Sequence, residues 1–512
     1  MGLLAWVDTA GGEPERTSGK GVGVSEQERR TSGGAGYEDV GSDYLEQRQL
    51  QKGAAGWVLL AGLGVAYVIS GDFAGWHFGL GAGGWGGLLI ATVLMATMYT
   101  AMVFSLAELS STIPTAGGGY GFARRAMGPL GGFMTGTAIL IEYAIAPAAI
   151  ATFIGGYVET LTGIGGWIVY LACYLIFVGI HLYGVGEALK VTFGITVVAV
   201  IALVAFIIGM IPQFEVSNLF TIDPTNAAGA SSFLPFGVVG IWAAFPFAIW
   251  FFLAIEGVPL AAEETQDPSR DVPRGLIAGM AALLLFAVLV LFFGPGGAGS
   301  AAFTSDEMLA APSVLPLALQ EAYGGTNALV TFVNIAGLAG LIASFFSLIF
   351  AYSRQTFALS RAGYLPRVLS VTGGRRTPWM ALVVPGAIGL TLSIVGGSTG
   401  GVVLLNSAVF GATISYALMM LSHIVLRRRE PDLERPYRTP GGTFTSGLAF
   451  VLAVMAVIAT FIVDIRAALI MLGVYALFLA YFGLYSRNHL VAQAPEEEFA
   501  TIEQAESELA GS

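Results

Sequence analysis

Three carboxylic acids stand inside long apolar runs, where an ionised side chain is costly. They are Asp72 within ISGDFAG (69–75), Glu142 within LIEYAIAP (140–147) and Glu256 within WFFLAIEGVP (250–259). No Lys or Arg occurs at a comparable depth in any apolar run. A buried charge must be paired or neutralised, so either protons occupy these carboxyls or a positively charged ligand supplies the missing cation. The sequence therefore predicts a buried site for protons or for a positively charged ligand.

Each acid also has a purely structural interpretation. Asp72 could be protonated and donate to a carbonyl freed by an irregular helix. Glu142 could be a neutral acid that packs between helices, and Glu256 could stabilise a break without contacting a ligand. Acids that share one cavity titrate together, so the sequence does not assign a single proton to one of them.

Neighbouring side chains could complete such a site. Ser70 offers a hydroxyl beside the first acid, and the hydroxyl of Tyr143 could reach the ligand. Trp250 and Phe251 could cover an ammonium group by cation–π attraction, worth ~0.5–2 kcal/mol. The candidate binding residues are Ser70, Gly71, Asp72, Phe73, Glu142, Tyr143, Trp250, Phe251, Ala254 and Glu256.

Two of the acids stand among residues that interrupt helices. Gly71 precedes Asp72 in the first apolar run, and Gly257 and Pro259 follow Glu256 in the sixth. Segments five helices apart run in opposite directions across a membrane. Two interrupted segments at that spacing are typical of secondary transporters built from two inverted five-helix repeats, with a binding site near the midplane.

The composition predicts a membrane protein. Hydrophobic residues make up 55% of the 512 residues and charged residues only 11%, against ~25% charged in soluble proteins. A membrane-spanning helix needs ~20 apolar residues. Twelve such runs are predicted, at 54–80, 86–113, 130–160, 164–183, 190–211, 237–262, 275–294, 326–353, 379–396, 402–426, 445–464 and 467–486.

Basic residues predict the orientation of these helices, because short cytoplasmic loops are enriched in Lys and Arg. With the N-terminus inside, 22 of the 23 bases fall on the cytoplasmic side and only Arg466 lies outside. We therefore expect twelve helices with both termini in the cytoplasm. Glu108, Glu263 and Glu264 lie at cytoplasmic helix ends and are expected to pair with loop arginines.

The net charge of −11 resides in the two terminal segments. Residues 1–47 hold nine acids and four bases, and residues 491–512 hold six acids and no base. Both are rich in small and polar residues, so we expect a disordered cytoplasmic N-terminal tail and a disordered acidic cytoplasmic C-terminal tail. Residues 48–490 are predicted to form one transmembrane transporter domain.

Other functions find little support in the residue pattern. The single cysteine, Cys173, and four widely separated histidines give no spacing of metal ligands. There is no P-loop for a nucleotide, and no motif places a nucleophile, a base and an orienting group together. The bases are loop anchors rather than one patch, so nucleic acid is not an expected partner. We therefore expect no cofactor, no metal and no enzymatic activity.

Several stretches resemble the amino acid-polyamine-organocation (APC) permease superfamily. The matching loop stretches are LAEL (106–109), IPTAGGGY (113–120), GP (128–129), AAEE (261–264), DP (267–268), PR (273–274), SR (353–354) and SRAGYLP (360–366). The resemblance covers residues 44–487. It implies an all-α integral membrane protein with a LeuT-like fold, in which two inverted five-helix repeats carry interrupted helices 1 and 6 and are followed by two more helices. It also implies the bacterial cytoplasmic (inner) membrane.

Within that superfamily the chain is most similar to the bacterial ethanolamine permease group, on the stretches KGAAGW (52–57), VISGDFAGW (68–76) and IEYAIAP (141–147). The resemblance implies import of ethanolamine as its ammonium cation. Amino acid permeases of the superfamily usually have an aliphatic residue where this chain has Asp72, and Gly where it has Ala254. A carboxylate at position 72 would attract an amine and repel a substrate carboxylate. This favours an amine that has no carboxylate.

The alternatives are an amino acid or polyamine permease of the same fold and, from another class, a transporter-like amine receptor. The expected partners are a small-molecule amine, membrane lipid and a coupling proton or sodium ion. Some proton-coupled members carry a Lys in helix five where this chain has Ala199. Ser344 and Ser347 in the eighth segment could serve a sodium site, although Ser is common in membrane helix packing.

Overall fold

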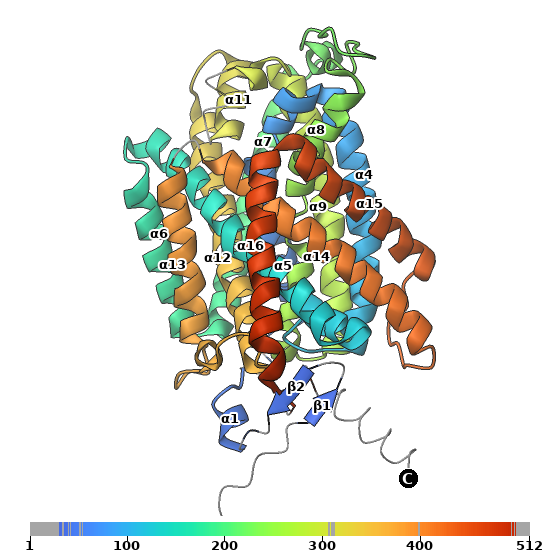
Figure 1. The fold of residues 1–512 in the computed structure, drawn as a ribbon. Helices are drawn as coiled ribbons and strands as arrows, with labels where there is room; N and C mark the ends of the chain where they lie inside the picture. The colour runs from blue at the N-terminus through green and yellow to red at the C-terminus, as the bar shows by residue number, and fades with distance from the viewer. Residues whose placement is uncertain are drawn as a thin grey trace, which may run out of the picture.

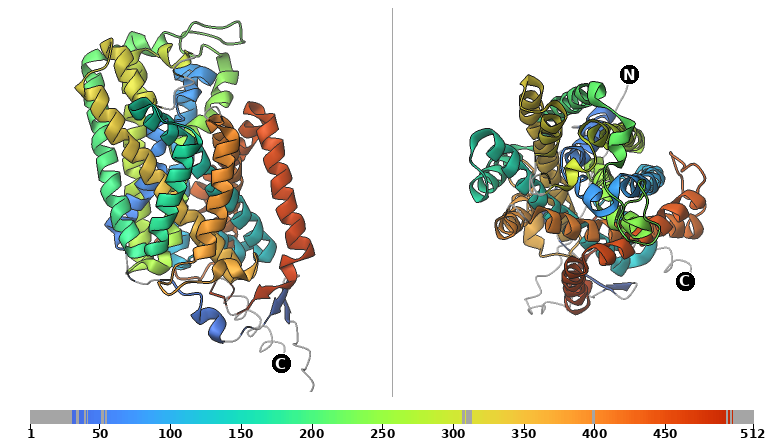
Figure 2. Two further views of the ribbon diagram at one scale, coloured as in Figure 1. Left: turned by 90° about the vertical axis from the view of Figure 1, so that its left-hand side faces the viewer. Right: turned by 90° about the horizontal axis from the view of Figure 1, so that it is seen from above.

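The computed structural model of the chain describes residues 30–32, 35–38, 40, 42–50, 53, 55–305, 308, 313–397, 400–492, 494, 495 and 497. Long helices form one bundle in which their axes run roughly side by side (Figure 1). The side view and the view from above show helices from both halves of the chain packed around a common centre (Figure 2). The described part of the chain is all-helical apart from one small sheet at one end.

The helices of the bundle overlap the predicted apolar runs. In chain order they are α2 (Trp57–Val68), α3 (Ser70–Phe73), α4 (Phe78–Thr112), α5 (Gly119–Thr162), α6 (Trp167–Tyr183), α7 (Val185–Met210), α8 (Gly237–Trp250), η3 (Ile255–Glu264), α9 (Pro268–Ala298), α11 (Val314–Tyr323), α12 (Ala328–Arg361), α13 (Trp379–Gly396), α14 (Gly401–Arg429), α15 (Thr443–Val463) and α16 (Ile465–Leu484). The connections between α7 and α8 and between α9 and α12 are the longest ones in the bundle and contain short helices.

Ten helical segments of the described chain are long and apolar enough to cross a membrane. Two of the twelve predicted runs, 54–80 and 164–183, correspond to shorter apolar helices, Trp57–Phe73 and Trp167–Tyr183. A multi-pass membrane protein is therefore confirmed in its general form. The count of twelve crossings remains a prediction.

Two long helices bend at glycines with positive φ. In α4 the bend lies at Gly84 (φ 68°), and in α5 it lies at Gly128 (φ 78°), directly before Pro129. Glycine adopts this backbone conformation without a Cβ clash, and proline cannot continue the preceding hydrogen-bond ladder. The predicted run 130–160 is therefore the part of α5 that follows its bend.

The two segments that were predicted to be interrupted lie inside the bundle. The α2 helix packs against α9 and α7, and α8 packs against α4. Small residues allow the close contacts: a Cβ on Gly83 of α4 would lie 2.4 Å from the carbonyl oxygen of Gly240 in α8. Such small-residue contacts are how membrane helices gain packing energy without a hydrophobic driving force between them.

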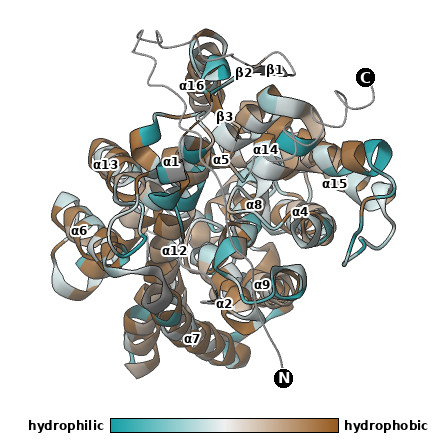
Figure 3. Cartoon of the chain, turned by 90° about the horizontal axis from the view of Figure 1, so that it is seen from below, coloured by the Kyte–Doolittle hydropathy of each residue, from teal (hydrophilic) through white to brown (hydrophobic). Residues whose placement is uncertain are grey.

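Both terminal segments contribute to the sheet. Strand β1 (Arg30–Ser32) pairs antiparallel with β2 (Ala35–Glu38), which pairs parallel with β3 (Leu490–Val491). Figure 3 views the bundle from this end, which we call the terminal face. Strand β2 is followed by the short helix α1 (Ser42–Glu46), seen beside the sheet in Figure 1.

The folded parts of the terminal segments differ from the disorder expected for 1–47 and 491–512. Tyr37 of β2 and Leu490 of β3 are buried together with Phe482 of α16. Each segment alone has too little apolar surface to fold, but the two segments and the helix ends share one small core. Residues 1–29 and 498–512, as well as Lys52, lie outside the described residues.

Candidate functional site

The first break lies between α2 and α4, where the chain contains Asp72. A hydroxyl from α12 enters the helical ladder here: Ser344 Oγ accepts from the Ser70 N–H at 2.9 Å and donates to the Ala66 carbonyl at 2.7 Å. It thus replaces the direct bond that a regular helix would form between residues four apart. After Phe73 the backbone becomes extended at Ala74 (φ −159°) and then turns at Gly75 (φ 95°). The predicted interruption of this segment is present.

The second break lies between α8 and η3. Four residues separate the end of α8 from the start of η3, and Ala254 among them has a left-handed backbone (φ 78°). A residue with a Cβ pays roughly 1–2 kcal/mol for this conformation, which glycine adopts freely. The predicted interruption at Glu256 is therefore present, and Ala254 carries its sharpest turn.

Aromatic residues at the end of α8 join the two breaks. Trp250 Nε1 donates to the carbonyl of Ala74 at 3.1 Å, and Phe251 stacks on Trp76 with ring centroids 6.0 Å apart. A Cβ on Gly71 would lie 2.3 Å from the carbonyl oxygen of Trp250. Trp250 and Phe251 therefore pack against the first break. Their role as a cover for an ammonium group stays a prediction.

Glu142 and Glu256 lie against each other in the centre of the bundle, although they come from α5 and η3. Their exposed fractions are 0% and 3%, and the two carboxyl groups interact with each other. The Tyr143 hydroxyl donates to Glu256 Oε1 at 2.8 Å, and the Tyr416 hydroxyl donates to Glu142 Oε1 at 3.2 Å. Each carboxyl keeps one oxygen without a hydrogen-bond partner among the described residues.

Asp72 is buried apart from this pair. Its exposed fraction is 1%, and neither carboxyl oxygen has a hydrogen-bond partner in the described part of the chain. The residues beside Asp72 make contacts with other parts of the structure. Trp76 Nε1 donates to the Asp72 carbonyl at 3.1 Å, and Phe73 packs its ring against Gly340 of α12. The structure thus brings Glu142, Tyr143 and Glu256 together and leaves Asp72 as a second, separate carboxyl.

Three further residues complete this centre, and sequence reasoning missed two of them. Tyr416 of α14 touches Glu142 and also accepts the Ala254 N–H at 3.5 Å, while its hydroxyl lies 3.1 Å from that of Tyr99 in α4. Ser344 was considered only for sodium. Buried tyrosine hydroxyls need partners, so a tyrosine inside an apolar run is the signal that could have found both tyrosines.

The acids at the helix ends pair with arginines, and that prediction is confirmed. Glu264 contacts Arg354 at 2.7 Å, with both side chains almost fully buried. Glu263 contacts Arg361 at 2.6 Å, so η3 is tied twice to α12. Glu108 at the end of α4 similarly contacts arginines of the segment around α14, namely Arg427 and Arg435.

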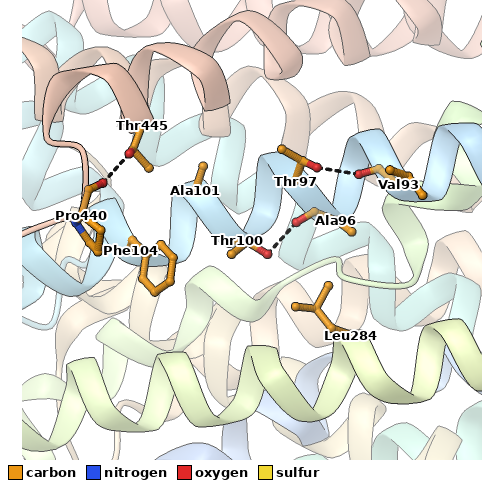
Figure 4. A pocket seen from close by; sticks show the side chains of 9 residues that line it. All are labelled: Val93, Ala96, Thr97, Thr100, Ala101, Phe104, Leu284, Pro440 and Thr445. Carbon is orange, nitrogen blue, oxygen red and sulfur yellow. Dashed lines mark hydrogen bonds between the residues drawn. The ribbon is translucent and has the colours of Figure 1, made fainter.

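A pocket on the flank of the bundle is not lined by Asp72, Glu142 or Glu256. It is lined from α4, α9 and the start of α15, and Figure 4 shows its side chains. Its threonine hydroxyls bond to backbone carbonyls nearby, so they offer no free polar group: Thr97 donates to Val93 and Thr100 to Ala96. None of the ten predicted binding residues lines it. We therefore place the candidate site at the two breaks.

Comparisons with a family model and with individual proteins both point to amino acid permeases. A family model described as amino acid permease matches residues 58–494. An uncharacterized transporter of Rhizobium meliloti is 29% identical over 78% of this chain and 85% of its own length. A branched-chain amino acid permease of Bacillus subtilis is 27% identical over 79% of this chain and 86% of its own length. An L-asparagine permease of Streptomyces coelicolor is 27% identical over 83% of this chain and 89% of its own length.

Proposed function

The chain belongs to the amino acid permease family, and from that premise we propose that it is a secondary transporter that imports a small amine as a cation. Its relatives are named transporters and permeases rather than enzymes. The proposed site lies at the two breaks. It comprises Asp72 on one side and the Glu142 and Glu256 pair on the other.

One observation carries this proposal: the buried carboxyls at the breaks, and Glu142 of α5 beside them, have no Lys or Arg as an ion-pair partner among the described residues. In the described part of the chain, no Lys or Arg forms an ion pair with Asp72, Glu142 or Glu256. Elsewhere the same chain pairs its buried acids with arginine, as at Glu264. An unpaired buried charge is unfavourable, so we infer that a cationic substrate or a proton neutralises these carboxylates.

Ethanolamine is the first candidate substrate. It has an ammonium group for a carboxyl and a hydroxyl that could bond Tyr143 or Ser70, and it has no carboxylate for Asp72 to repel. The backbone N–H groups that could hold a substrate carboxylate at the first break are partly used, because Ser70 N–H bonds Ser344 and Asp72 N–H bonds the Ile69 carbonyl. This supports an amine without a carboxylate.

An amino acid is the second candidate, and the names of the relatives favour it. A branched-chain amino acid permease and an L-asparagine permease align along most of this chain. An α-amino acid would place its ammonium near the carboxyl pair and would need a partner for its carboxylate. With Asp72 protonated, that group could donate a hydrogen bond instead of repelling the substrate.

Competition in proteoliposomes separates the candidates. Uptake of radiolabelled ethanolamine is measured with excess unlabelled ethanolamine, alanine or putrescine. Our proposal expects saturable uptake that ethanolamine suppresses and alanine does not, and expects Asp72→Asn to abolish it in folded protein. Saturable alanine uptake without ethanolamine uptake would replace the first candidate by the second. Amine binding without counterflow would indicate a receptor.

Orientation and coupling belong to the same proposal. We place the terminal face in the cytoplasm because 22 of 23 basic residues fall on that side of a twelve-helix arrangement. We propose inverted repeats with α2 and α3 in helix 1 and with α8 and η3 in helix 6. Substrate arrival would favour movement of the broken helices against the rest of the bundle. A proton on the Glu142 and Glu256 pair is the proposed coupling ion.

A further inference from the structure

A carboxylate of the C-terminal segment is enclosed by donors on the terminal face. Glu497 is fully buried, and Arg124 Nε lies 2.9 and 2.7 Å from its two carboxyl oxygens. Three tyrosine hydroxyls point to the same carboxylate, from Tyr364 at 3.1 Å, Tyr37 at 3.3 Å and Tyr120 at 3.4 Å. Charge-assisted bonds of this kind are about twice as strong as neutral ones.

The donors come from parts of the chain that are distant in sequence. Tyr37 belongs to β2, Tyr120 and Arg124 to the first turns of α5, and Tyr364 follows α12. Burial raises the pKa of the Tyr37 and Tyr364 hydroxyls above the usual tyrosine value, and the neighbouring Glu497 raises both further. Both hydroxyls therefore remain protonated donors. This arrangement is a site built for a carboxylate.

The C-terminal segment also attaches to the end of α12 through its backbone. The Val491 N–H donates to the Ala362 carbonyl at 3.0 Å. The next residue, Gly363, has φ 88°, and a Cβ there would lie 2.2 Å from the His489 carbonyl oxygen. Only glycine fits this approach without displacing the backbone of the segment. The segment is therefore seated on the turn that ends α12.

The same turn of α12 holds the second broken helix. Arg361, which precedes Ala362, contacts Glu263 of η3 at 2.6 Å. Its carbonyl accepts a hydrogen bond from Tyr44 of α1 at 2.8 Å. Any opening of the terminal face between η3 and α12 must separate this ion pair. Both terminal segments bond to the end of α12, which carries the arginine of this ion pair.

We propose that Arg124, Tyr37, Tyr120 and Tyr364 form a docking site for the C-terminal segment, and that Glu497 in this site holds the terminal face closed between η3 and α12. The segment thus acts as an autoinhibitory latch of the transporter, an inference that rests on the proposed function. Release of Glu497 loosens the end of α12, so Arg361 holds Glu263 less firmly and the face opens more often.

Cysteine labelling of the full chain tests the latch without any substrate. Ala262 of η3 is 1% exposed, so Ala262→Cys in a Cys173→Ser background reports opening by its reaction with a maleimide. Loss of the charge-assisted bonds in Glu497→Gln should raise the labelling rate about tenfold. The matched control is Glu430→Gln, which breaks a partly exposed pair with the neighbouring Arg125 and should leave the rate within about twofold.

Peptide rescue provides the second measurement. A chain that ends at residue 488 should label as fast as Glu497→Gln, and an added peptide of residues 489–512 should slow it again. The same peptide carrying the Glu497→Gln change should not. Unchanged labelling in Glu497→Gln, an equal increase in Glu430→Gln, or rescue by both peptides would overturn the latch. Because none of these rates depends on transport, failure of the proposed substrate leaves the test intact.

Discussion

Replacing Glu142 with glutamine should remove the response of uptake to a pH gradient while uptake itself continues. Glu142 and Glu256 lie against each other and are 0% and 3% exposed. Two ionised carboxylates ~4 Å apart repel by ~4 kcal/mol at an effective dielectric constant of ~20. That energy disfavours the doubly ionised pair by about a thousandfold. The pair should therefore retain one proton until a cation reaches it.

The substitution removes the repulsion but preserves the shape of the site. The amide oxygen of the introduced glutamine can still accept from the Tyr416 hydroxyl, which now lies 3.2 Å from Glu142 Oε1. Glu256 keeps its bond from Tyr143 at 2.8 Å and supplies one negative charge without a shared proton. We therefore expect the variant to bind the amine but to move no coupled proton.

The assay is initial uptake of radiolabelled ethanolamine in proteoliposomes with an imposed pH gradient at a clamped membrane potential. The unaltered protein should respond to the gradient, and Glu142→Gln should give the same rate with and without it. Glu159→Gln is the control, since Glu159 is an exposed residue of the same helix. A full response to the gradient in Glu142→Gln would refute the shared proton.

Three further predictions concern the two breaks and the ion pair between η3 and α12. Ala254→Gly should stabilise the protein by up to about 1 kcal/mol in detergent unfolding, because relief of ~1–2 kcal/mol of left-handed strain exceeds the added chain entropy; a loss of stability would contradict it. Gly71→Ala should lower uptake at least about tenfold and cost about 1–3 kcal/mol of unfolding free energy, since its Cβ would lie 2.3 Å from the Trp250 carbonyl oxygen and the two backbones would have to move apart; normal uptake would show that the breaks need not touch. Arg354→Met should cost about 3–5 kcal/mol of unfolding free energy, and adding Glu264→Met should recover part of it; additive losses in this double-mutant cycle would argue against the pair.

The membrane class and the position of both breaks followed from local sequence. Long apolar runs are costly in water and suit a bilayer, whatever the helices later contact. Gly, Pro and an acid within one run mark an irregular helix for an equally local reason, and both marked segments are interrupted. The pairing of Glu263 and Glu264 with arginines was also predictable, since buried acids at helix ends need nearby cations.

Only the tertiary structure decided which acids meet. Sequence reasoning treated Asp72, Glu142 and Glu256 as one group, but the fold joins the last two and leaves Asp72 apart. Their contact depends on the rotation and depth of α5 and η3, which arise from packing among several helices. Hydrophobic runs that are apolar on all sides carry no periodic signal for that rotation.

The terminal segments show the same division. Their composition predicts disorder when each is considered by itself, because neither has enough apolar surface. The structure joins β2 to β3 and buries Glu497 beside Arg124, a pairing of residues 373 positions apart. What the sequence determined was therefore the set of buried charges and breaks, which depend on neighbours along the chain. The partners of those charges depend on contacts between distant segments, which only the folded chain specifies.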